Sequence, residues 1–130
     1  MEQHSSVNVL KAISDGKSLE IFRDVANGTM ESDVLKQKEG MTKKQFYSRM
    51  QALRKVGLVK RRKGRFSLNT FGIIVYHAES IIEAGVGNYW KLRAIDSIQN
   101  SEQIAENERM KLIKTILNDN AIEDILVKQR

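Results

Sequence analysis

The spacing of apolar residues along the chain predicts a mostly helical protein. Apolar side chains recur at the 3.6-residue period that lines one face of a helix. The expected helices cover residues 7–13, 18–27, 42–56, 70–82, 89–98, 101–117 and 120–126, and Glu31 or Ser32 opens a further short one that carries Val34 and Leu35. Ser18, Thr70 and Asn120 stand at predicted helix starts, Asn120 with Glu123 as a capping box. Gly85 and Gly87 are expected to break or kink the long helix.

The helix over residues 42–56 has the clearest start and two contrasting faces. Thr42 is a favourable N-cap, and Gln45 three residues later completes a capping box. The apolar residues share one face, which ends at the predicted stop residue: Phe46, Met50, Leu53 and Gly57. The opposite face is polar and basic: Lys44, Ser48, Gln51 and Lys55. A helix with an apolar back and a front of Lys, Gln and Ser suits the major groove of DNA.

Two short runs, residues 58–62 and 65–69, predict a β-hairpin. Lys63-Gly64 separates them, and the glycine supplies the positive φ that a tight turn needs. The predicted fold class is therefore mainly α with a small β-hairpin wing. The order of elements is that of a winged helix-turn-helix domain over residues 7–78, followed by a C-terminal helical extension over residues 79–130. The extension is either additional core on the same monomer or, as we favour, a dimerisation region.

Positive charge is concentrated in one segment. The chain carries a net charge of +6, yet no acidic residue stands between Gly40 and Ala78. That stretch contains ten basic residues: Lys43, Lys44, Arg49, Arg54, Lys55, Lys60, Arg61, Arg62, Lys63 and Arg65. The remainder of the chain is net −4. A solvated surface usually mixes the two signs, so a nucleic-acid footprint is the better interpretation.

Several segments resemble known regulators. Residues 10–22 resemble the opening helix pair of arsenic-repressor-type regulators, residues 42–61 their recognition helix running into the wing, and residues 66–72 the second wing strand and the start of the dimerisation helix. The step Gly57-Leu58-Val59 is shared with the multiple-antibiotic-resistance type and with archaeal winged-helix proteins. The resemblance implies that these recognition-helix residues contact DNA: Thr42, Lys43, Lys44, Gln45, Tyr47, Ser48 and Arg49. It implies the same for the wing residues Arg61, Arg62, Lys63 and Arg65, and Lys60 opens the basic wing at residues 60–66.

Metal-sensing members of that group use cysteine pairs or His/Asp sets. This chain has no cysteine and two histidines, His4 and His77, so no metal site is expected. No cofactor is expected, and no catalytic motif is present, which argues against an enzyme. No signal peptide is visible, and residues 71–86 are too short and too charged to span a bilayer. A cytoplasmic location is expected.

The expected function is sequence-specific binding of double-stranded DNA by a dimeric transcriptional regulator. Its operator, the direction of regulation and any effector stay open. The main alternative is a winged-helix protein-interaction module whose basic face binds an acidic partner. An RNA or single-strand binder is disfavoured, because Tyr47 and Phe66 are the only aromatic residues near the basic face.

Overall fold

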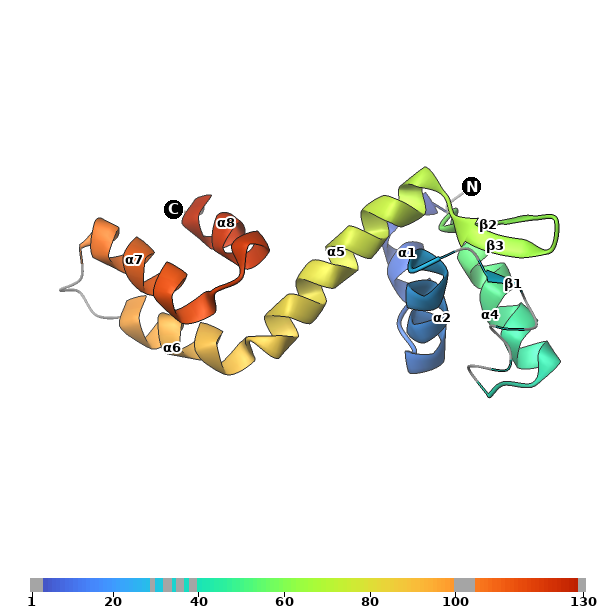
Figure 1. Ribbon diagram of the computed structural model, residues 1–130, viewed down its shortest axis with the longest axis horizontal. Helices are drawn as coiled ribbons and strands as arrows, with labels where there is room; N and C mark the ends of the chain where they lie inside the picture. The colour runs from blue at the N-terminus through green and yellow to red at the C-terminus, as the bar shows by residue number, and fades with distance from the viewer. Residues whose placement is uncertain are drawn as a thin grey trace. The chain divides into compact units, whose positions relative to one another are not determined.

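The structure, a computed structural model, describes residues 4–28, 30–31, 34, 37, 40–99 and 105–128. The chain divides into two compact units, Met1–His77 and Ala78–Arg130, which are described separately below. Helices make up most of the described residues, and the strands among them form a small antiparallel sheet within the first unit (Figure 1). The prediction of a mainly helical chain with a small β-hairpin is confirmed.

The chain opens with two short helices, α1 (Ser6–Ala12) and α2 (Gly16–Ala26). Asp15 caps α2, because its side chain accepts a hydrogen bond from the backbone N–H of Ser18 at 2.9 Å. The predicted start near Ser18 is therefore wrong by one helical turn. Ser18 lies in the first turn, is buried, and donates its hydroxyl to the second Asp15 carboxylate oxygen at 2.8 Å.

The helix α4 (Lys43–Lys55) begins and ends as its sequence predicts. Both hydrogen bonds of the Thr42–Gln45 capping box are present at 3.1 Å. At the other end Gly57 has φ +85°, and the N–H groups of Gly57 and Leu58 donate to the carbonyls of Arg54 and Leu53 at 3.0 Å. This pair of bonds is the Schellman arrangement that satisfies the last carbonyls of a helix.

The sheet has the strand order β1-β3-β2. The predicted hairpin is confirmed as β2 (Val59–Arg62) and β3 (Arg65–Leu68). Its turn residues Lys63 and Gly64 have φ values of +54° and +76°, the signs of a type I′ turn that matches strand twist. The third strand, β1 (Met30–Glu31), pairs Glu31 with Arg65. Glu31 is therefore in a strand rather than at a helix start, and Leu35 of the helix expected there lies outside the described residues.

The core of the first unit contains three phenylalanines among aliphatic and methionine side chains. Phe22, Phe46 and Phe66 are buried, and the rings of Phe46 and Phe66 meet edge to face at 6.1 Å. The helix α5 (Thr70–Gly87) begins against this core, where Gly72 approaches the chain so closely that a β-carbon on it would lie 2.0 Å from the Leu58 carbonyl oxygen. Thr70 is the first residue of α5 rather than its cap, since the Asn69 carbonyl accepts the first helical hydrogen bond, from Ile73.

The second unit consists of the end of α5 and the helices α6 (Tyr89–Gln99), α7 (Glu106–Leu117) and α8 (Asn120–Lys128). Four buried aliphatic residues form its core: Ile95, Ile113, Leu117 and Ile122. The break predicted near Gly85 and Gly87 falls at Asn88, because α5 continues through Gly85. Asp119, not Asn120, caps α8, and the predicted start at Ser101 lies outside the described residues.

Candidate nucleic-acid interface

One side of α4 packs into the core and the other side is open to solvent. Phe46, Met50 and Leu53 are buried, as the apolar period predicts. Most of the predicted DNA-binding residues on this helix are exposed: Thr42, Lys43, Lys44, Gln45 and Ser48. Tyr47 and Arg49 are half-buried, and the Tyr47 ring packs against Phe46 at 5.2 Å. The exposed side of α4 therefore presents amide, hydroxyl and ammonium groups, which suit base edges and phosphates.

The hairpin also has two unlike faces, because side chains alternate along each strand. Its register places Val59 opposite Leu68 and Arg61 opposite Phe66 on one face. Val59 and Phe66 are buried there, and the guanidinium of Arg61 lies 5.6 Å from the centre of the Phe66 ring. A cation over a ring face at this distance is held by the ring's negative electrostatic potential. Arg61 is thus oriented by the core while it stays exposed.

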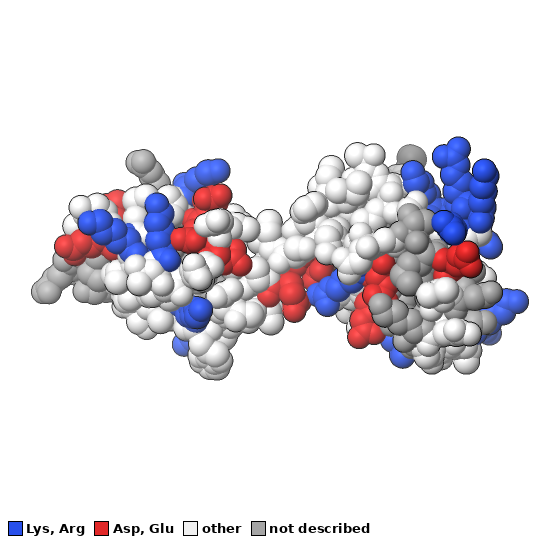
Figure 2. All heavy atoms as spheres, viewed as in Figure 1, with Lys and Arg blue, Asp and Glu red and all other residues white. Residues whose placement is uncertain are grey.

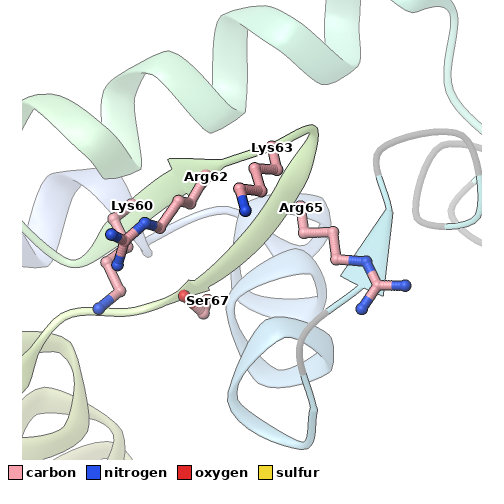
Figure 3. A pocket seen from close by; sticks show the side chains of 5 residues that line it. All are labelled: Lys60, Arg62, Lys63, Arg65 and Ser67. Carbon is pink, nitrogen blue, oxygen red and sulfur yellow. The ribbon is translucent and has the colours of Figure 1, made fainter.

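The other face of the hairpin is cationic. Five side chains line a shallow hollow of about 500 Å³ on it: Lys60, Arg62, Lys63, Arg65 and Ser67. Figure 3 shows that Lys60, Arg62 and Lys63 extend over the hairpin, whereas Arg65 extends the other way, toward β1. Ammonium and guanidinium groups that line one hollow repel one another, and an anion in the hollow would relieve that repulsion.

A second hollow, of about 370 Å³, joins α4 to the hairpin. It is lined by residues from the end of the helix and from β2: Gln51, Arg54, Lys55, Val59, Lys60 and Arg61. Arg54, Lys55 and Gln51 were not among the predicted site residues, although Gln51 and Lys55 lie on the predicted polar face of the helix. Lys and Arg side chains gather at the hairpin end of the first unit, whereas basic and acidic residues are interspersed in the second unit (Figure 2).

Two carboxylates from outside the basic segment reach arginines within it. Asp15 Oδ1 lies 3.3 Å from Nε of Arg49, and Glu31 Oε1 lies 3.6 Å from a terminal nitrogen of Arg65. Hydrogen bonds from Ser18, with a smaller contribution from Arg49, hold the pKa of Asp15 below its ordinary value. Local sequence patterns do not predict either ion pair, because each joins residues that are 34 positions apart in the chain.

Other kinds of site are not supported by the described residues. No group of three or more His, Asp and Glu side chains is placed there to hold a metal ion. No described helix is long and apolar enough to cross a membrane. Comparison of the chain with protein-family models, with curated proteins and with solved structures found no match. The interface therefore has to be interpreted from its own chemistry.

Proposed function

We propose that this chain is a winged helix-turn-helix protein that binds double-stranded DNA and regulates transcription as a dimer. One observation carries the proposal: a single basic surface joins α4 to the hairpin. The segment that forms it, between Gly40 and Ala78, contains no acidic residue. The order α1, α2, α4, β2, β3, α5 supports the winged-helix assignment. An arsenic-repressor-like relationship and a cytoplasmic location are parts of the same proposal.

In the proposed complex α4 enters the major groove. Lys44, Gln45 and Ser48, exposed near the start of the helix, approach base edges, where Lys suits guanine and Gln suits adenine. Arg61, Arg62 and Lys63 contact phosphates or the adjacent minor groove. The DNA strand whose phosphates separate the two grooves would lie in the hollow between α4 and the hairpin. Basic side chains from both α4 and the hairpin line that hollow.

A salt titration of binding to a duplex of mixed sequence tests this function. If about six to ten phosphates are neutralised per complex, log Kobs falls against log salt with a slope of roughly −5 to −9. Arg61→Ala with Arg62→Ala should weaken binding and reduce that slope by about 2. Lys111→Ala with Lys114→Ala removes two exposed charges from α7 and is the matched control. A slope near zero, or equal losses in both double variants, contradicts the proposal.

The proposed dimer uses α5. This helix leaves six large apolar side chains exposed: Phe71, Ile73, Ile74, Ile81, Ile82 and Val86. A coiled-coil seam uses positions that alternate between three and four residues apart. This spacing is met by residues 71, 74, 78, 81 and 85. In an antiparallel pair of α5 helices Ile74 meets Gly85, and Ile81 meets Ala78. In these pairs a large residue faces a small one. The proposed partner on this side of α5 is therefore a second copy of the chain.

Sedimentation equilibrium tests the dimer. Ile81→Lys places a charge in the seam and should convert the protein to a monomer, because an unpaired charge in an apolar interface is costly. Glu83→Lys places a lysine on the opposite side of α5 and should leave the dimer intact. A monomeric wild-type protein, or equal effects of the two variants, contradicts this assignment.

A further inference from the structure

Arg49 differs from the other basic residues of the surface because a fixed carboxylate holds it. Asp15 caps α2 and accepts two hydrogen bonds from Ser18, one from its N–H at 2.9 Å and one from its hydroxyl at 2.8 Å. Ser18 is itself buried, at 3% exposure. These two bonds restrain the carboxylate, whose side chain is 52% exposed, and it accepts a further hydrogen bond from the Nε–H of Arg49 at 3.3 Å.

The Arg49 side chain is still within reach of a ligand. It is 30% exposed and lies on α4, one turn after Gln45. Among the residues that the structure describes, Asp15 is the one ion-pair partner of Arg49, and the bond uses Nε rather than the terminal amino groups. The terminal amino groups let a phosphate approach, but a two-pronged bond through Nε and one terminal nitrogen requires the Asp15 carboxylate to leave Nε.

The pair is also weak enough to exchange. Partly exposed ion pairs contribute little in water, because solvent screens the attraction and the long side chain loses freedom. A phosphate offers Arg a two-pronged, charge-assisted bond. A phosphate that binds Arg49 through Nε therefore displaces the carboxylate from the same guanidinium.

We propose that Asp15 and a phosphate of duplex DNA compete for Arg49, so that Asp15 lowers affinity for DNA of any sequence. This inference rests on the proposed function. It assigns Asp15 a role in restraining sequence-independent binding, separate from its role as the cap of α2. The pair between Glu31 and Arg65 is longer, at 3.6 Å, and its arginine side chain is 59% exposed against 30% for Arg49.

A double-mutant cycle tests the competition. Asp15→Asn keeps a good N-cap but removes the charge, and Asp15→Ser is a second variant of the same kind should the first fail to fold. Either should tighten binding to a mixed-sequence duplex by about twofold to fivefold, the equivalent of one partly exposed ion pair. The slope against log salt should steepen by about 0.9, because one more phosphate is contacted. In an Arg49→Gln background the same substitution should change neither quantity.

Three results would overturn the inference. The first is an equal gain in duplex affinity from Asp15→Asn with and without Arg49, which indicates plain repulsion between Asp15 and DNA. The second is an unchanged or lower duplex affinity on Asp15→Asn in the wild-type background. The third is the same gain from Glu20→Gln, which removes one exposed negative charge from α2. Wild-type protein that binds no duplex at low salt would instead overturn the proposed function, and this inference with it.

Discussion

The two units of the chain differ in the make-up of their cores and in the charge of their surfaces. The first unit closes over a core that contains three phenylalanines among aliphatic and methionine side chains, and it presents its basic segment to solvent. The second unit closes over a small aliphatic core, and it leaves Trp90 77% exposed and Val86 64% exposed. Scattered exposed apolar residues are ordinary, but a row of them along one helix marks an interaction surface. In the proposed function the basic surface of the first unit meets DNA, and the exposed apolar side chains of α5, which belong to both units, meet a second copy of the chain.

The strongest test of this division removes one core residue from each unit. Phe46→Ala should cost about 3–5 kcal/mol and Ile113→Ala about 2–5 kcal/mol, because each leaves a cavity at a fully buried position. Hydrogen exchange followed by mass spectrometry should show lost protection in α2 and α4 for the first variant. The second variant should lose protection in α7 and α8. If either substitution reduced protection from hydrogen exchange in both units, the two units would not be separate in stability.

Two glycines of α5 should respond to alanine in opposite directions. Gly72→Ala places a methyl group against the Leu58 carbonyl, and we expect a loss of about 3 kcal/mol. Gly85→Ala meets no atom within 4 Å in the isolated chain, and it should raise the free energy of unfolding of the monomer by about 0.5–1 kcal/mol. Urea unfolding at low protein concentration measures both. Because Gly85 faces Ile74 in the proposed seam, the same variant should dimerise more weakly, and unchanged dimerisation would argue against that register.

The smallest expected effect is on the pH dependence of folding stability. The pKa of Asp15 is lowered in the folded state by hydrogen bonds from Ser18 and by Arg49. A lowered pKa contributes stability above the unfolded value, about 3.9, and this contribution is lost as pH falls through the folded value. The stability difference between the wild type and Asp15→Asn should therefore narrow below about pH 4. Urea midpoints from pH 7 down to pH 3 measure it, and a constant difference would contradict the assigned cause.

Local sequence predicts the elements whose determinants lie within a few residues. The Thr42–Gln45 cap, the apolar face of α4, the stop at Gly57 and the turn at Lys63-Gly64 are all of this kind, and the structure confirms them. Where two good caps stand close together, propensity does not choose between them. Asp15 caps α2 although Ser18 was expected at its start, and Asp119 caps α8 although Asn120 was expected.

Features that join distant parts of the chain were missed. The strand β1 exists because Met30 and Glu31 pair with Phe66 and Arg65, and no local pattern signals such a pairing. The same holds for the Asp15–Arg49 contact, which brings an acid from the first helices to a surface that looked free of acids. The predicted DNA-binding residues lie on α4 and the hairpin, but which of them reach DNA stays a prediction.

The base of the hairpin is closed by Asn69. Its side-chain amide donates to the Gly57 carbonyl and its N–H to the Leu58 carbonyl, both at 3.0 Å. These bonds fix where the hairpin leaves the end of α4 and where it returns, whichever residues form the tip. The tip can therefore lengthen, shorten or change its charge over evolutionary time without disturbing the core. A protein built in this way can acquire new binding preferences by varying one loop.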